Sequence, residues 1–478
     1  MPDDLYRLTA REAVRRLRAG EVTPLDLIDA VERRAAAVNG AVNALVTPAY
    51  ERARDHARRL MKLAPAERGV LAGLPVAIKD LNDVAGVRTT YGSPIFADNV
   101  PKVSDIMVQR VEASGGIVVG MTNTPEFGAG ANTFNAVFGE TRNPWNPALN
   151  AAGSSGGSAA ALATGIVALA TGSDLGGSLR TPASFCSVVG FRPSPGRVAN
   201  GPAEQRFNDL SVEGPMARNV LDAALLLDAM SGWRVEDPIS LPAPPEPFLA
   251  AAERRRKPKR VALSVDLGGV TPVDPLTRAI VRQAADKLAN AGIEIVEASP
   301  DFSGAMEVFH VLRGLGYATN MRTLLMNHRD QLKPDVIWNI EQGMALTAER
   351  IGQALLRRSR LYGEVVKFFE SHEFLLAPGA CCPPNPIEER WVRAVDGHVF
   401  ENYIGWLTLP AVITLTSCPA LAIPTGFTGD GRPVGIQLVG APRGDAAVLS
   451  AGAAIEEILG IAGAVPIDPK PARPLPAA

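Results

Sequence analysis

Apolar residues recur along the chain with two spacings, one typical of helices and one typical of buried strands. Residues 8–62 show the helical spacing, with Gly20 as a stop and Thr23-Pro24 as the start of a second helix. From about residue 74 to 230, short apolar runs alternate with helical stretches. The strand-like runs lie at 76–78, 117–120 and 167–171, and the helical stretches lie at 104–113, 158–164 and 220–230. This order predicts an α/β protein with a largely buried sheet.

A proline-rich segment, residues 235–260, interrupts this alternation and ends in a basic run that we interpret as a solvated connector. Strand and helix patterns then return. We expect strands at 261–265, 293–298, 374–377, 420–424 and 434–439, a helix at 277–291, and a mostly helical region at 303–372. The last dozen residues, 467–478, are rich in proline, and we expect them to be disordered.

Composition and charge are those of a soluble globular protein. The 478 residues are 46% hydrophobic and 21% charged, and the net charge is −2. Such a chain has no global field to attract nucleic acid or an anionic membrane, so we expect neither as a partner. The acidic N-terminus has no signal-peptide pattern and the longest apolar stretch, 159–170, is too short to span a bilayer, which favours a cytoplasmic location. The oligomeric state is open, and a homodimer is one arrangement that we consider.

The four cysteines predict structural thiols rather than a metal site. They are Cys186, Cys381, Cys382 and Cys418. None forms a CxxC pair and no histidine cluster accompanies them at zinc spacing. No nucleotide-binding glycine motif follows a strand. We therefore expect neither a metal nor a cofactor.

Lys79 ends one of the apolar runs, within residues 73–80 (GLPVAIKD). Lysine is rarely buried in such a run unless it is paired or functional. A lysine can act as a base near pH 7 only if its pKa falls by about 3 units from about 10.4, and burial in an apolar strand supplies the necessary desolvation. Lys79 is therefore a candidate general base.

Two glycine-serine clusters follow, at residues 153–158 (GSSGGS) and 172–178 (GSDLGGS). Ser178 directly precedes a predicted helix start, so it can project from a tight turn as a nucleophile. Glycine lets the backbone approach a substrate closely, so neighbouring amides can converge on an oxyanion. The amides expected to do so are those of Leu175, Gly176, Gly177 and Ser178.

A histidine base has little support from the sequence. None of the five histidines lies beside a glycine-serine cluster; they are His56, His310, His328, His372 and His398. One alternative remains, because residues 153–157 fit the GxSxG elbow of Ser-His α/β-hydrolases with Ser155 as the nucleophile. That elbow needs a strand directly before the serine, and residues 142–150 have the composition of a loop.

Several segments together resemble the amidase signature family of Ser-cisSer-Lys amide hydrolases. The resemblance covers most of the chain and is weakest between about 240 and 400. The matching segments are 73–80 (GLPVAIKD), 153–161 (GSSGGSAAA), 172–183 (GSDLGGSLRTPA), 189–193 (VGFRP), 214–218 (GPMAR), 419–424 (PALAIP) and 435–440 (GIQLVG). The chain departs from the commonest family pattern at Ala152, Leu175 and Ser187, where glycine, threonine or isoleucine, and glycine are frequent.

The resemblance implies one large α/β domain with a mixed, twisted sheet flanked by helices. It implies an amidase domain over residues 1–470, with its core at about 65–230 and 405–465. It also implies a variable, largely helical region on the substrate side at about 300–405, and a proline-rich, disordered tail at 471–478.

The resemblance also implies a catalytic triad. Ser178 would be the nucleophile, and Ser154, after a cis peptide bond, would link it to neutral Lys79. Ser155 and Asp174 would support this network. The substrate pocket would include Phe127, Gly128, Ala129, Gly130, Phe134 and Phe138. Further aromatic candidates for an apolar pocket are Trp145, Tyr317, Trp338 and Trp391.

We therefore expect an amide hydrolase that forms an acyl-enzyme and cleaves small linear amides, with aryl or alkyl amides favoured over a small dicarboxylic amide and with esters and aryl carbamates as side substrates. Besides the Ser-His hydrolase, two alternatives remain. One is the A-type subunit of a tRNA-dependent amidotransferase complex, and the other is a non-catalytic binding protein on the same scaffold.

Overall fold

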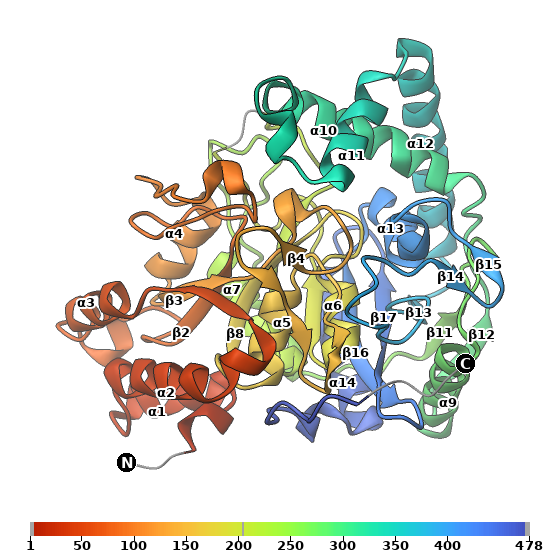
Figure 1. Ribbon diagram of the computed structural model, residues 1–478. Coiled ribbons are helices and arrows are strands. Elements are labelled where there is room, and N and C mark those ends of the chain that lie inside the picture. Colours follow the sequence, from red (N-terminus) through yellow and green to blue (C-terminus); the bar gives the residue numbers. More distant parts are fainter. Residues whose placement is uncertain (1–3, 203–204, 474–478) are drawn as a thin grey trace.

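A mixed sheet of eleven strands forms the centre of the computed structural model, which describes residues 4–202 and 205–473 (Figure 1). The strands lie side by side in the order β1-β3-β2-β8-β10-β9-β16-β17-β13-β11-β12. Their bounds are β1 Leu45–Pro48, β2 Pro75–Lys79, β3 Ile117–Thr122, β8 Leu169–Asp174, β9 Val189–Arg192, β10 Val212–Ala217, β11 Arg260–Leu263, β12 Glu294–Glu297, β13 Phe374–Pro378, β16 Ala420–Phe427 and β17 Pro433–Gly440. The predicted α/β class with a mixed sheet flanked by helices is confirmed.

The sheet consists of two parallel groups of strands, an antiparallel part between them, and the edge strand β1, which is antiparallel to β3. Strand β2 is parallel to both β3 and β8, and β11 is parallel to both β12 and β13. The strands between these two groups pair antiparallel, from β8 through β10, β9, β16 and β17 to β13. The carboxyl ends of the parallel strands β2 and β8 therefore meet at one edge, where side chains from both can form a site.

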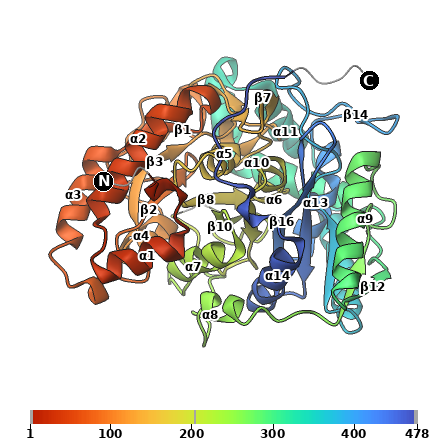
Figure 2. The same cartoon turned by 90° about the horizontal axis from the view of Figure 1, so that it is seen from below.

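Helices cover both faces of the sheet. Seen edge-on, α5 and α6 lie on one face and α7 and α14 on the other (Figure 2). The helices are α1 Ala10–Ala19, α2 Pro24–Val42, α3 Tyr50–Leu60, α4 Ile106–Ala113, α5 Gly156–Ala163, α6 Arg180–Cys186, α7 Val220–Met230, α8 Phe248–Glu253, α9 Pro275–Asn290, α10 Ala305–His328, α11 Pro334–Met344, α12 Ala348–Phe368, α13 Thr408–Leu415 and α14 Asp445–Leu459. Helices α10, α11 and α12 form a separate layer at one end of the molecule, at the top in Figure 1.

Short elements complete the chain. Three two-stranded ribbons lie outside the main sheet, and single-turn 3-10 helices occur in the loops. The ribbon strands are β4 Phe134–Asn135, β5 Gly139–Glu140, β6 Arg142–Asn143, β7 Asn146–Asn150, β14 Ala394–Val395 and β15 His398–Val399. The 3-10 turns are Leu5–Arg7, Pro65–Glu67, Pro94–Phe96, Glu126–Gly128, Arg329–Gln331, Gly405–Leu407 and Ala462–Ala464.

The predicted helix boundaries near the N-terminus are confirmed. Gly20 ends α1 in the left-handed conformation at φ 69°. Thr23 caps α2, because its hydroxyl accepts the Asp26 amide at 3.2 Å while the Asp26 carboxylate accepts the Thr23 amide at 2.8 Å. The all-helical expectation for residues 8–62 is wrong at Leu45–Pro48, which forms β1 at the edge of the sheet. Four residues are too few to show a period of their own.

The structure differs from the expectations in three other places. Strands β9 and β10 were not predicted, because their small and polar residues, such as Gly190, Glu213 and Gly214, hide the apolar pattern. Residues 142–150, expected to be loop, contain the β6–β7 ribbon. Residues 467–470 are not disordered, since Ile467 donates to Ala163 and Lys470 to Pro144 through their amides.

Part of the expected tail at 471–478 can be described. Arg473 exchanges backbone hydrogen bonds with the Asn146 side chain at 2.7 and 3.0 Å. Residues 474–478 lie outside the described part of the chain, where disorder stays a prediction. No helix of residues 4–202 and 205–473 combines the length and the apolar character that crossing a membrane requires.

Candidate active site

Lys79 is the last residue of β2, a strand whose five residues are all buried. It pairs across the sheet with Thr122 of β3, and its amide donates to the Thr171 hydroxyl of β8 at 3.2 Å. The side chain has no solvent exposure. Its Nζ lies 2.6 Å from Ser154 Oγ and 2.9 Å from Ser173 Oγ. The expected buried amine is therefore in hydrogen-bond contact with one of the two expected serines.

Burial sets the charge state of this amine. Desolvation lowers the pKa of Lys79 to about 7, although the carboxylates of Glu213 and Asp174 oppose the change. Both contacts of Nζ are to neutral hydroxyls, so no carboxylate in the described residues forms a direct ion pair that would hold the proton on Lys79. A substantial fraction of Lys79 is therefore neutral near pH 7.

Ser154 lies in a backbone segment that several hydrogen bonds hold in place. The Gly153–Ser154 peptide bond is cis, as the resemblance implied. On one side, Thr133 Oγ1 donates to the Ala152 carbonyl at 2.8 Å. On the other, the Ser155 amide donates to the Ser178 carbonyl at 3.2 Å, which joins the two glycine-serine clusters. Ser154 is therefore fixed between Lys79 and the loop that carries Ser178.

Ser155 connects the same two clusters through its side chain. Its hydroxyl accepts the Ser173 amide at 3.3 Å and lies 3.4 Å from the Ser173 carbonyl. Gly172 permits this contact, since a Cβ there would lie 2.7 Å from Ser155 Oγ. These bonds fit the supporting role expected for Ser155.

Ser178 lies in the loop between β8 and α6, and it is half-buried while its neighbours Gly176 and Gly177 are buried. In the described part of the chain, the amides of Leu175, Gly176 and Ser178 have no hydrogen-bond acceptor. Unpaired amides beside an accessible hydroxyl can hold an oxyanion. The expectation for Gly177 is corrected, because its amide donates to Asp174 Oδ1 at 2.9 Å and thereby shapes the loop.

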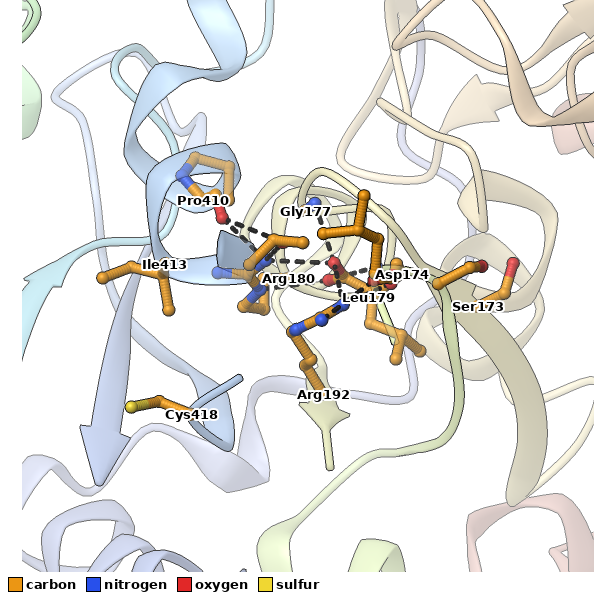
Figure 3. A network of polar contacts seen from close by, with 12 residues as sticks. Ser173, Asp174, Gly177, Leu179, Arg180, Arg192, Pro410, Ile413 and Cys418 are labelled. Atoms are coloured by element: carbon orange, nitrogen blue, oxygen red, sulfur yellow. Dashed lines mark hydrogen bonds and ion pairs between the residues drawn. The ribbon is translucent and has the colours of Figure 1, made fainter. Parts of the chain in front are cut away.

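Asp174 organises this loop through a buried ion-pair network (Figure 3). Arg180 donates to both carboxylate oxygens at 3.0 Å, and Arg192 donates to Oδ1 at 3.2 Å. The Gly177 and Leu179 amides add bonds at 2.9 and 3.2 Å. All three charged side chains are fully buried. Desolvation raises the pKa of Asp174, but the two guanidinium groups outweigh it and hold the pKa well below its usual range.

Gly128, one of the six expected pocket residues, lies against Ser154, and Phe127 precedes it in the chain. A Cβ at Gly128 would lie 3.4 Å from Ser154 Oγ. Phe127 adopts φ 47°, a left-handed conformation that bulky residues rarely accept. Hydrogen bonds to Tyr91 and Tyr317 hold it there, at 2.8 and 3.1 Å. Half-buried Phe127, Tyr91 and Phe96 pack with ring centroids 5.1–6.4 Å apart.

The other expected pocket residues face cations instead. Lys333 Nζ contacts three of these residues. It donates to the Ala129 carbonyl at 3.1 Å, fills the space beside Gly130, and lies 3.7 Å from the Phe134 ring centroid. The Phe138 ring lies against Arg88, with the guanidinium 5.0 Å from its centroid.

The four additional aromatic candidates for the pocket lie in different surroundings. Tyr317 contacts Phe127 as described, and Trp338 packs edge-on against Tyr403 with centroids 5.9 Å apart. Trp391 lies against Arg393. Trp145 belongs to the core, because its indole donates to the Cys186 carbonyl at 3.0 Å and its ring packs on Phe427.

Two residues near Lys79 were missed by sequence reasoning. Ser173 reaches Nζ from β8, and Glu213 lies opposite Ser173 in the register between β8 and β10. Glu213 is buried, and desolvation raises its pKa to about 7 although Lys79 opposes the change. Ser173 belongs to the glycine-serine cluster at 172–178, so its position there could have indicated a place near the site. Nothing in the sequence indicated that Glu213 lies near Lys79, because β10 was not predicted.

The Ser155 alternative lacks a base. A strand, β7, does precede this serine, but it ends at Asn150 in a ribbon apart from the main sheet. None of the five histidines makes a hydrogen bond with Ser154, Ser155 or Ser178 in the described residues. Within the same residues, no group of three or more side chains is arranged to hold a metal ion.

Comparisons with known proteins agree on one family. A family model described as Amidase matches residues 26–449. An acylamidase from Rhodococcus erythropolis is 33% identical over 471 residues, covering 97% of this chain and 98% of that protein. A glutamyl-tRNA(Gln) amidotransferase subunit from Moorella thermoacetica is 33% identical over 481 residues, covering 95% and 97%. The crystal structure of a bacterial aryl acylamidase of the amidase signature enzymes superposes with a TM-score of 0.88 at 26% identity, covering 96% of this chain and 99% of that one.

Proposed function

The chain belongs to the amidase signature family, and from that membership we propose that Ser178 is its nucleophile, with Ser154 as proton relay and Lys79 as base. The protein is an amide hydrolase that acts on the C–N bonds of small linear amides. The observation that carries the proposal is the position of the Lys79 amine, which is wholly buried and 2.6 Å from Ser154 Oγ.

Acylation begins with proton transfer towards Lys79. The neutral amine takes the Ser154 proton while Ser154 takes the proton of Ser178, whose oxygen attacks the amide carbonyl carbon. A C–O bond forms, and the carbonyl π electrons move to oxygen. The unpaired amides of Leu175, Gly176 and Ser178 stabilise that oxyanion.

Collapse of the tetrahedral intermediate breaks the C–N bond. The leaving nitrogen needs a proton, which Ser154 supplies and recovers from the Lys79 ammonium. Water then attacks the acyl-enzyme by the same relay and releases the carboxylic acid. Ser155, Ser173 and Asp174 act by position: the two serines hold Ser154 and Lys79 in register, and Asp174 shapes the oxyanion loop.

We propose aryl acyl amides as the preferred substrates, with esters and aryl carbamates as side substrates. The similar proteins named acylamidase and aryl acylamidase support this choice. So does the half-buried aromatic group of Tyr91, Phe96 and Phe127, which is joined through Phe127 to Gly128, the neighbour of Ser154, because aromatic rings pack favourably edge-to-face or offset.

Kinetics with a substrate panel tests this function. We expect Ser178-dependent hydrolysis of 4-nitroacetanilide, slower hydrolysis of acetamide, and loss of activity in Ser178→Ala but not in the matched Ser303→Ala. Glutamine and a search for co-purifying subunits are included because an amidotransferase subunit is among the similar proteins. The proposal would be contradicted if the protein hydrolysed glutamine but no anilide, or if it were active only with a bound partner subunit.

A further inference from the structure

Arg313 of α10 is buried, with 8% of its surface exposed, but it has no carboxylate partner in the described part of the chain. Its Nε donates to Asn339 Oδ1 at 3.0 Å, and its Nη2 donates to the hydroxyls of Tyr317 and Tyr403 at 3.2 and 2.8 Å. A buried guanidinium without a counter-ion is costly. A negative charge from outside the chain would remove that cost.

The hydrogen bonds around Arg313 leave donors without acceptors. The Tyr317 hydroxyl donates to the Phe127 carbonyl at 3.1 Å. The Tyr403 oxygen accepts from Arg313 and, at 2.6 Å, from Asn339 Nδ2, but its own proton has no acceptor in the described residues.

Arg313 Nη1 likewise donates to nothing there, and solvent reaches this atom, since it is absent from the fully enclosed polar atoms that lack a partner. The two N–H groups of Nη1 and the neighbouring Tyr403 O–H group therefore lack acceptors in the described residues. Such a cluster suits an anion, and a guanidinium can hold a carboxylate through two hydrogen bonds.

The position of Arg313 connects it with the candidate active site. Phe309, Arg313 and Tyr317 are four residues apart and share one face of α10. Phe309 packs on the oxyanion loop, where a Cβ at Gly176 would lie 2.9 Å from its ring. Tyr317 bonds Phe127, the neighbour of Gly128 at Ser154. Arg313 thus lies midway along a stretch of about 12 Å whose two ends both contact the site.

A second cation near the site, Lys333, does have a carboxylate partner. Lys333 is also largely buried, but its Nζ pairs with Asp335 at 3.2 Å and donates to the Ala129 carbonyl. A carboxylate of the protein therefore balances the charge of Lys333, whereas Arg313 has the rings of Tyr317 and Tyr403 beside it but no carboxylate in the described residues.

We infer that Arg313, together with the Tyr403 hydroxyl, binds an anionic group, a carboxylate or a comparable oxyanion, carried by the amide substrate. This inference rests on the proposed function and narrows its substrate class to amides with a negative charge on the acyl or the amine part. Arg313 is then a specificity-determining residue.

Two matched pairs of chromogenic amides test the inference. Glutaryl-4-nitroanilide and pentanoyl-4-nitroanilide differ by a carboxylate on the acyl part, and 5-acetamido-2-nitrobenzoate and 4-nitroacetanilide differ by one on the amine part. For at least one pair we expect the wild-type kcat/KM to favour the charged substrate by about 30-fold or more. Arg313→Met and Tyr403→Phe should lower kcat/KM for the charged substrate far more than for its neutral partner, and so remove or reduce this preference.

Controls separate charge recognition from structural damage. Arg313→Lys should retain part of the preference, and Arg322→Gln, at an exposed position of the same helix, should retain all of it. Glutarate should also inhibit the wild-type enzyme more strongly than pentanoate, a result that needs no variant. The inference is overturned if the wild type shows no preference in either pair and no such inhibition, or if Arg313→Met lowers both members of a pair equally. If no anilide is hydrolysed in a Ser178-dependent way, the proposed function itself fails.

Discussion

The protonation of Lys79 is determined by two opposing effects at the scale of single residues. Burial removes water from the amine and favours its neutral form, whereas the negative charge of Glu213 favours the ammonium form. Glu213 is itself destabilised as a carboxylate by burial. Because the two groups act on each other, they titrate as a pair, and the charge of one sets the pKa of the other.

Replacing Glu213 with glutamine should shift the pH profile of the enzyme to lower pH. The Glu213 charge raises the pKa of Lys79, so its removal lowers that pKa and leaves more neutral amine at a given pH. We expect the ascending limb of kcat/KM for 4-nitroacetanilide to move down by about 1 unit. Glu456→Gln, a change at a buried glutamate of α14 that does not act on Lys79, should leave the limb in place. An unchanged or upward-shifted limb in Glu213→Gln would argue against this pairing.

The sequence pointed to the candidate catalytic side chains but not to the neighbour that shifts the pKa of Lys79. Lys79, Ser154 and Ser178 stand out because their local context is unusual for a lysine or a serine. Glu213 is an ordinary residue in sequence, and it reaches Lys79 only because β10 pairs with β8 in a particular register. Gly177 was assigned to the oxyanion hole because the motif does not reveal that its amide is already bonded to Asp174.

Two residues that depart from the family pattern adopt a backbone conformation that glycine favours. Ala152 and Ser187 stand where glycine is frequent, and both adopt left-handed backbone angles, at φ 55° and 57°. A residue with a Cβ is strained in this region, at a cost of about 1–2 kcal/mol. The backbone therefore keeps the conformation that glycine would favour, although the side chains differ.

At the scale of elements, the position of α10 depends on its close contact with α11. Gly343 of α11 packs directly on Gly314 of α10, where a Cβ at Gly343 would lie 1.9 Å from the Gly314 carbonyl oxygen. This contact lets the two helices approach closely. Phe309, on α10, meets the loop at Gly176 only if α10 keeps this position.

Two glycine-to-alanine changes in these helices should therefore have opposite effects. Gly343→Ala should force α10 and α11 apart, lower the free energy of unfolding by about 1–3 kcal/mol and reduce kcat/KM. Gly316→Ala meets nothing within 4 Å in α10 and should stabilise the protein by about 0.5–1 kcal/mol without loss of activity. Chemical denaturation and anilide kinetics measure both. Equal stability of the two variants would contradict the packing described here.

At the scale of the whole molecule, most of the apolar strands and longer helices were predicted, because burial gives them a clear pattern. The order of the strands could not be read from that pattern. Strand β2 lies between β3 and β8, and the C-terminal strands β16 and β17 complete the middle of the sheet. Long-range pairing of this kind depends on contacts that a periodicity does not encode. The family resemblance supplied the general architecture in its place.

The same long-range pairing assembles the site. Lys79 comes from β2, Ser154 from the loop before α5 and Ser178 from the loop after β8, and helix α10 reaches the loop at Gly176 from a separate layer. The proposed reaction therefore depends on the whole fold, and its central step is the proposed transfer of protons through Ser154 to a neutral, buried Lys79.

The rate at which a fluorophosphonate labels Ser178, measured against pH, tests this proton transfer most directly. The labelling reports activation of the nucleophile and does not depend on which amide is the substrate. With a Lys79 pKa of about 7, the neutral fraction rises with pH, and the labelling rate at pH 8 should be about tenfold the rate at pH 6. Lys79→Met should lower it by about a thousandfold. A labelling rate that does not depend on Lys79, or a label found on Ser155, would contradict the account.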